Sequence, residues 1–172
     1  MPEENKDINL PSIEVDFVGI RIEVPSNIPM LLFKENGTNK YLPISIGMPE
    51  ATSIMTILQN QILLRPLTHD LFNDFLNISG YGISKLNITN IDNGTFYADI
   101  VFIERNIDKE IVMSCRPSDG VALAIRNDTP VKIFINRELF EENYIELDAD
   151  NAEEEIEQFK SFLDEISPED FV

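Results

Sequence analysis

The 172-residue sequence contains one cysteine, Cys115, one histidine, His69, and no apolar run long enough to cross a bilayer. A single cysteine excludes an internal disulfide, and without partners at zinc-ligand spacing it is more typical of a core residue than of a nucleophile. A membrane-spanning helix needs about 20 consecutive apolar residues. Residues 1–9 are polar and acidic, unlike a signal peptide. We therefore expect a soluble, cytoplasmic protein that does not associate with membranes.

Basic residues are also scarce, because 13 Lys and Arg stand against 31 Asp and Glu, for a formal net charge of −18. Most of the excess lies at the end of the chain. Residues 138–172 hold 14 acidic residues, with Lys160 as their one basic residue. Proteins that bind nucleic acids usually present a basic surface. This charge distribution therefore argues against tight binding of a polyanion.

The sequence lacks a Gly-rich phosphate loop, a Gly-x-Ser-x-Gly elbow and a His-Glu-x-x-His motif. What it does have is a set of polar side chains at three expected helix starts: Glu50; Thr68, His69 and Asp70; Arg116, Ser118 and Asp119. Helix N-termini attract anions such as phosphate, and Arg65 and Arg116 could add bidentate contacts. Each residue also has a plain structural explanation as a cap, a dipole contact or an ion pair, and from local chemistry alone that explanation is the commoner one.

The apolar periodicity predicts an α+β fold, in which helices pack on a largely antiparallel, mixed β-sheet. Strands are expected at 13–24, 30–34, 40–46, 82–91, 95–104, 110–115 and 131–135, and helices at 49–61, 68–79, 118–125 and 137–143. Asn36-Gly37 and Asn93-Gly94 are strong hairpin signals, so residues 82–115 should form a three-stranded meander.

Two details of the expected helices concern the polar residues directly. Short oxygen-bearing side chains favour helix N-caps, so Thr68 should cap the second helix and Ser118 with Asp119 the third. The second helix should pack through an apolar face that consists of Leu71, Phe72, Phe75 and Leu76.

The domain organisation follows from composition. We expect a poorly ordered or disordered segment at 1–12, one folded domain at 13–147, and an acidic helix with its tail at 148–172. In the last segment, Ile156, Phe159, Leu163 and Ile166 recur at helical spacing. Its two phenylalanines, Phe159 and Phe162, suggest that it docks on the domain or on a second subunit.

Several stretches together resemble the bacterial members of the bifunctional nuclease family. They are Gly19-Ile-Arg-Ile-Glu23, Tyr41-Leu-Pro-Ile-Ser-Ile-Gly47 with Glu50-Ala51, Arg65-Pro-Leu-Thr-His-Asp-Leu-Phe72, Asp92-Asn-Gly-Thr-Phe-Tyr-Ala98, Arg116-Pro-Ser-Asp119 with Ala122-Leu-Ala-Ile-Arg126, and Phe162 to Phe171. The resemblance implies a compact α+β domain, a homodimer, and an activity on both RNA and DNA. Gly120 departs from the family motif, which usually has alanine there; a glycine should loosen the first helical turn slightly.

The leading hypothesis is a nuclease that hydrolyses RNA and DNA phosphodiesters with low sequence preference. His69 would be a general base or a metal ligand, Asp70 and Asp119 metal ligands or orienting groups, and Arg116 a phosphate clamp. Glu50 and Ser118 complete the candidate site, with Mg²⁺ or Mn²⁺ as its possible cofactor. The alternative is a non-catalytic homodimeric interaction or regulatory module, whose acidic C-terminal helix binds a protein partner.

Overall fold

The computed structural model describes residues 11–23, 26–107 and 109–147. The expected disordered segment at 1–12 lies outside the described residues, apart from its last two positions, and Ser12 already belongs to the first strand. The expected acidic helix and tail at 148–172 lie wholly outside them. Among the described residues, no helix has both the length and the apolar composition that crossing a membrane requires.

Eight strands of the described chain form one mixed, mostly antiparallel sheet, in the order β6-β5-β4-β7-β1-β2-β3-β8. The strands are β1 Ser12–Glu23, β2 Ile28–Glu35, β3 Lys40–Ser45, β4 Tyr81–Asp92, β5 Thr95–Glu104, β6 Lys109–Cys115, β7 Lys132–Asn136 and β8 Ile145–Glu146. The expected α+β fold is therefore confirmed, including the meander formed by β4, β5 and β6.

The two predicted hairpins form at their Asn-Gly signals. Asn93 and Gly94 both have positive φ, 49° and 78°, as a two-residue hairpin turn between antiparallel strands requires. Gly37 also has a positive φ, in the connection between β2 and β3. These residues therefore set the two turns locally.

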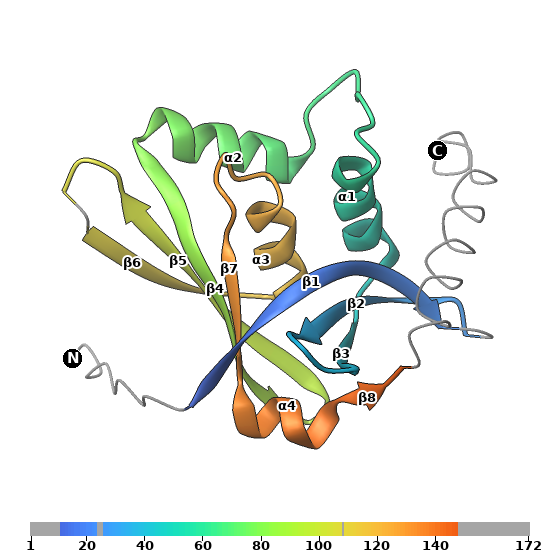
Figure 1. Ribbon diagram of the computed structural model, residues 1–172. Helices are drawn as coiled ribbons and strands as arrows, with labels where there is room; N and C mark the ends of the chain where they lie inside the picture. Colours follow the sequence, from blue (N-terminus) through green and yellow to red (C-terminus); the bar gives the residue numbers. More distant parts are fainter. Residues whose placement is uncertain (1–10, 24–25, 108, 148–172) are drawn as a thin grey trace.

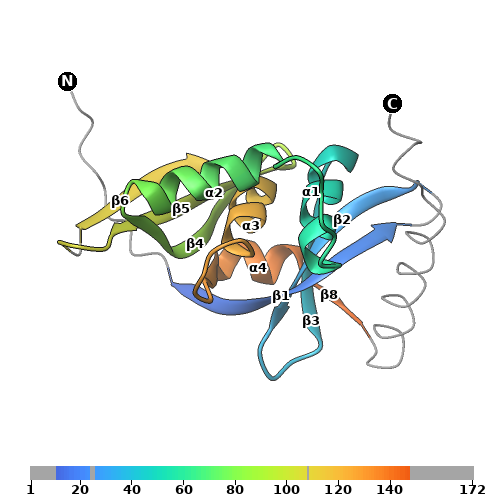
Figure 2. The same ribbon diagram turned by 90° about the horizontal axis from the view of Figure 1, so that it is seen from above.

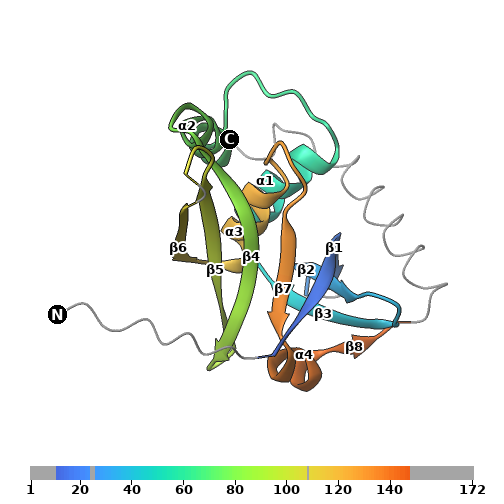
Figure 3. The same cartoon turned by 60° about the vertical axis from the view of Figure 1, so that its left-hand side comes forward.

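The strand β7 joins the two halves of the sheet. It pairs in parallel with β4 on one side and antiparallel with β1 on the other. The parallel pairing requires a crossover, and the chain makes it through β5, β6 and a helix, α3. Figures 1 and 3 show how strongly the sheet twists, so that β4, β5 and β6 run in a different direction from β1, β2 and β3.

In the described part of the chain, four helices pack on this sheet: α1 Met48–Leu58, α2 Thr68–Ile78, α3 Pro117–Ala124 and α4 Arg137–Asn143. The short α3 is almost wholly buried and contacts α1, α2, β4 and β5. Seen from above, α3 lies between α1 and α2 (Figure 2). Consequently, the N-terminal ends of three helices come together over one face of the sheet.

The predicted caps are wrong. The N-cap of α2 is Leu67 rather than Thr68, and the carboxylate of Asp70 accepts a hydrogen bond from the Leu67 N–H at 2.7 Å. The N-cap of α3 is Arg116, with no side-chain cap from Ser118 or Asp119. Pro117 fills the first helical position, where its missing N–H costs nothing, and Asp119 is engaged elsewhere.

The prediction for the apolar face of α2 is also partly wrong. Leu76 is buried and Phe72 packs against Phe102 of β5, but Leu71 and Phe75 are mainly exposed. With Ile78, these two lie at helical positions i, i+4 and i+7 and so share one face. We call Leu71, Phe75 and Ile78 the exposed stripe of α2.

Candidate functional site

An ion-pair cluster lies where the three helix starts meet. Arg116 donates to both carboxylate oxygens of Asp119, from Nε at 2.9 Å and Nη2 at 3.0 Å. Its Nη1 donates to Glu50 of α1 at 2.7 Å. Hydrogen bonds and charge from Asp119, followed by those from Glu50, raise the pKa of Arg116 above its usual value. The guanidinium is thus fully charged and fixed in orientation, while the Arg116 side chain remains 65% exposed.

The position of Glu50 depends on a glycine. Gly47 is the N-cap of α1 and has an ordinary extended conformation, φ −76° and ψ 158°. The carboxylate of Glu50 folds back over Gly47 and occupies the space that a Cβ would need there. The absence of a side chain at position 47 therefore allows Glu50 to reach Arg116.

His69 connects this cluster to a second one. Its Nε2 lies 3.5 Å from Oδ1 of Asp119, and its Nδ1 lies 2.9 Å from Oγ of Ser53. Ser53 Oγ also accepts a hydrogen bond from Arg126 at 3.2 Å. Because a guanidinium can only donate, the Ser53 hydroxyl proton is available for Nδ1. The neutral imidazole then carries its proton on Nε2, directed at Asp119.

Arg126 is the centre of the second cluster, and its side chain is only 3% exposed. It donates to Asp70 Oδ1 at 2.6 Å, to the carbonyl of Ala122 at 2.8 Å and to the carbonyl of Ser53 at 3.0 Å. Burial raises the pKa of Asp70, but the hydrogen bonds from Arg126 and the Leu67 N–H outweigh it and hold that pKa below its usual value. Asp70 therefore pairs with a buried arginine.

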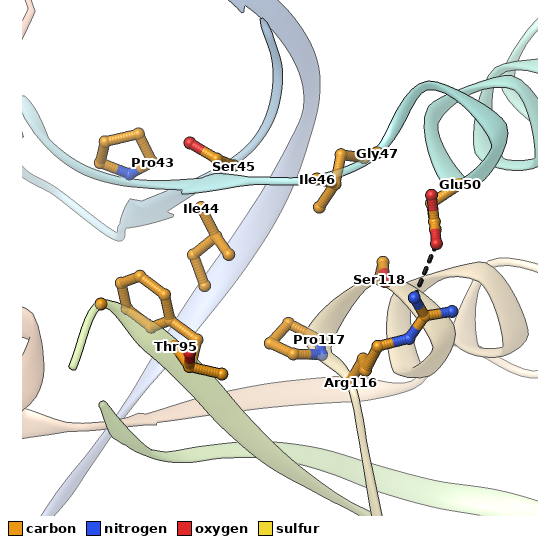
Figure 4. A pocket seen from close by; sticks show the side chains of 12 residues that line it. Pro43, Ile44, Ser45, Ile46, Gly47, Glu50, Thr95, Arg116, Pro117 and Ser118 are labelled. Carbon is orange, nitrogen blue, oxygen red and sulfur yellow. Dashed lines mark hydrogen bonds and ion pairs between the residues drawn. The ribbon is translucent and has the colours of Figure 1, made fainter. Parts of the chain in front are cut away.

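Two cavities flank the Arg116–Glu50 ion pair. The first has a volume of about 620 Å³ and is lined by residues of α1, α2 and the start of α3, among them Ser53, Thr68, His69, Glu50 and Arg116. The second, of about 420 Å³, lies between the end of β3, the β4–β5 hairpin and the start of α3 (Figure 4). Glu50 and Arg116 line both cavities, so the ion pair forms a wall between them.

The structure brings some of the predicted site residues together and separates others. Glu50, His69, Arg116 and Asp119 form one connected network, as described above. Ser118 is buried and lines the second cavity. Asp70 lines neither cavity and turns to Arg126, while Arg65 is exposed between α1 and α2.

The described residues of the site favour neither a nucleophilic thiol nor a cluster of metal ligands. Burial, with smaller contributions from Asp119 and Asp99, raises the pKa of Cys115 to about 11, so its thiol is a poor nucleophile. Among residues 11–23, 26–107 and 109–147, no three His, Cys, Asp or Glu side chains gather as a metal site. Glu50 and Asp119 already neutralise Arg116, so a cation would compete with it for both carboxylates.

Sequence reasoning did not single out Ser53 or Arg126. Ser53 lies in the middle of α1, where the pattern offers no reason to choose it over Thr52 or Thr56. Arg126 follows an apolar helix and is one of 13 basic residues. The available signal was the position of Arg126 directly after an apolar helix. If such a residue is buried with the helix, its charge requires a partner, and this predicts an ion pair.

Comparisons with known proteins show which sequences this chain resembles. A sequence profile of the bifunctional nuclease domain matches residues 30–148. An uncharacterized protein of Mycobacterium tuberculosis is 41% identical over 164 residues, which cover 92% of this chain and 97% of that protein. Bifunctional nuclease 2 of Arabidopsis thaliana is 24% identical over 106 residues, and bifunctional nuclease 1 of Oryza sativa is 22% identical over 105. Each plant match covers 60% of this chain and 32% of the plant protein. The chain therefore belongs to the bifunctional nuclease domain family.

Proposed function

We propose that this protein hydrolyses phosphodiester bonds of RNA and DNA, with low sequence preference, at the cavity lined by Glu50, His69 and Arg116. The observation that carries the proposal is an exposed guanidinium, held by two carboxylates, beside the one histidine of the chain. The names of the plant relatives, with which it shares the domain, point to the same chemistry.

Arg116 would hold the phosphate. A guanidinium has five N–H groups, and Asp119 and Glu50 together accept from three of them. The remaining N–H groups, one on each terminal nitrogen, can each donate to a phosphate oxygen. Asp119 is a positioning residue, because it orients both Arg116 and His69.

Glu50 and His69 would move the protons. They approach a phosphate on Arg116 from different sides, since Glu50 binds Nη1 while Asp119, which contacts His69, binds Nε and Nη2. Water attacks phosphorus and loses a proton to Glu50. The bond from phosphorus to the leaving sugar oxygen breaks, and that oxygen takes the Nε2 proton of His69 in its protonated form, in which Nδ1–H donates to Ser53 Oγ instead of accepting from it. The Ser53–His69 arrangement favours this donor role over the base or ligand role expected from the sequence.

The test is cleavage of RNA and DNA oligonucleotides by the full chain, with EDTA, with Mg²⁺ and with Mn²⁺ in parallel. Loss of a general acid costs about 10²- to 10⁴-fold, so His69→Ala and His69→Ala/Asp119→Ala should lose at least that much. Asp74→Asn on the exposed side of α2 is the matched control. Equal trace activity in wild type and the double variant would identify a contaminant and overturn the proposal.

A second candidate function is a non-catalytic homodimeric module, and the exposed stripe of α2 favours it. A helix that presents Leu71, Phe75 and Ile78 to solvent is typical of an association surface. Here a second copy of the chain would cover the stripe, and the acidic residues 148–172 would recruit a protein partner. Under this hypothesis, His69→Ala lowers stability rather than turnover. Deletion of 148–172 would abolish partner capture while leaving the domain folded.

A further inference from the structure

The cavity of about 420 Å³ beyond Arg116 has no role in the hydrolysis proposed above. Figure 4 shows its walls, which come from segments far apart in the sequence: the end of β3, the start of β5 and the start of α3. Its volume lies in the range of small-molecule sites, about 300–1,000 Å³. Because it shares Arg116 and Glu50 with the first cavity, a ligand that binds Arg116 can extend into both.

The lining of this second cavity combines apolar surfaces with one unusual polar group. Pro43, Ile46, Phe96 and Pro117 provide the apolar walls. Ser118 also lines it, is 5% exposed, and has no side-chain hydrogen-bond partner among the described residues. A buried hydroxyl without a partner costs free energy. Such a group at a cavity wall points to a ligand that supplies the missing hydrogen bond.

A flat ring with polar atoms at its edge fits this lining. The ring can lie against Phe96 and the prolines, and an edge atom can pair with the Ser118 hydroxyl. A nucleobase has this chemistry, and stacking on an aromatic side chain tolerates every base. The adjacent Arg116 places a phosphate beside the ring, as in a nucleotide.

We propose that an unpaired nucleobase occupies this second cavity, that the strand crosses Arg116 into the first cavity, and that the substrate is single-stranded nucleic acid. This inference rests on the proposed function. A base inside a duplex is stacked and paired, and would have to leave the helix to enter. A single strand that crosses Arg116 places one phosphate on this arginine. This mode of binding needs only one phosphate contact, so it does not require the extended basic surface that this acidic protein lacks.

The experiment measures binding and cleavage separately, with the full chain. Binding of a fluorescent ten-nucleotide oligothymidylate is followed by anisotropy in EDTA. Phe96→Ala should weaken it about tenfold, the usual effect of removing one stacking partner, and Ser118→Ala should weaken it severalfold. Tyr97→Ala is the matched control, because the neighbouring residue of β5 faces the opposite side of the sheet and is 44% exposed. It should bind like wild type.

The outcomes separate this inference from the hydrolysis proposal. If wild type binds and the two cavity variants bind as well as Tyr97→Ala, the base-binding cavity is refuted whatever the cleavage assay shows. Binding that depends on Phe96 and Ser118 without any cleavage supports the cavity and refutes the hydrolase. Cleavage of a duplex as fast as of a single strand also overturns the inference. Should Phe96→Ala fail to fold, Ser118→Ala alone decides, because removing one hydroxyl preserves the shape of the residue.

Discussion

Arg126 and Asp70 illustrate why single residues in this site resist assignment from sequence. Asp70 directly follows the histidine at the start of α2, and this position in the sequence predicts a site residue. Its partner is a buried arginine 56 positions later, and no local pattern reveals such a contact. The same contact explains why Ser53 matters, since Arg126 also binds its carbonyl and its hydroxyl.

Asp70→Asn should destabilise the fold in a pH-dependent way. Removing one partner of a buried ion pair costs about 3 kcal/mol, and Arg126 would keep its charge without a carboxylate. Because the pKa of folded Asp70 lies below its usual value, its contribution is complete above about pH 4 and is lost as the pH falls through the folded pKa. Urea unfolding should therefore show a wide gap between wild type and variant at pH 7, and the gap should shrink as the pH falls below about 4.

The control for this prediction is Asp74→Asn, one turn further along α2 and exposed. It should unfold like wild type at each pH. A gap for Asp70→Asn that is equally wide at pH 7 and pH 3 would mean that the ion pair is not the source of the lost stability.

Gly47→Ala should impair activity with little effect on folding. The backbone at position 47 suits alanine, but the added methyl group takes the space of the Glu50 carboxylate and moves it away from Arg116. We expect a fall in kcat/KM of about 10²-fold, as for loss of a proton acceptor, and a change in unfolding free energy below about 0.5 kcal/mol. Parallel cleavage and thermal unfolding assays check both values; Glu50→Gln should reproduce the first. Unchanged kcat/KM would show that the position of Glu50 does not matter.

At the scale of elements, α3 is positioned by a close approach to β4. A Cβ on Gly120 would overlap Leu86, which is fully buried, and would lie 3.3 Å from the sulfur of Cys115. The glycine is thus the residue that lets α3 sit directly on the sheet. The close approach to Leu86 gives this glycine a packing role in addition to the looser first turn expected from the sequence.

Gly120→Ala should therefore destabilise the protein, although alanine is the better helix former by about 1 kcal/mol. Overpacking of a filled core costs about 1–3 kcal/mol, which we expect to see in urea unfolding. The double variant Gly120→Ala/Leu86→Ala should cost less than the sum of its single changes, because the smaller side chain makes room. If the losses in unfolding free energy of the two single variants add up in the double variant, Leu86 is not the side chain that the new methyl group overlaps.

Prediction from sequence succeeded where the determinants are local. The hairpin at Asn93-Gly94 depends on two residues that adopt positive φ. In β1 and β5, apolar and polar residues alternate because one face of the strand packs on the core, and this pattern is visible within the strand itself. It failed at Thr68, because the Asp70 carboxylate reaches back to the Leu67 N–H instead. It could not supply the parallel pairing of β4 with β7 or the position of Arg126, since both depend on contacts between distant segments.

At the scale of the whole molecule, charge and the exposed stripe of α2 act in opposite directions. A net charge of −18 disfavours association of two copies, whereas the stripe favours it through burial of apolar surface. Salt screens the repulsion between exposed charges but leaves the apolar contribution intact. The oligomeric state should therefore depend on ionic strength.

Sedimentation equilibrium should detect a dimer that becomes tighter between about 20 mM and 200 mM salt, where the Debye length shortens appreciably. Leu71→Ser/Phe75→Ser should be monomeric throughout, whereas Tyr97→Ser, which alters an exposed aromatic residue of β5, should still dimerise. A monomeric wild type at every salt concentration would contradict the dimer; a dimeric stripe variant would place its interface elsewhere.

The central position of β7 has a consequence for the order in which the chain can fold during synthesis. The ribosome releases β1, β2 and β3 first and β4, β5 and β6 later, yet these two groups are joined through residues 132–136. Until that five-residue strand emerges, the nascent chain holds two partial sheets with an unpaired edge on each, at β1 and at β4. Long-range pairing of this kind is slow, and exposed strand edges invite association. The pairing of β7 with β1 and β4 is therefore the step that completes the native sheet of the growing chain.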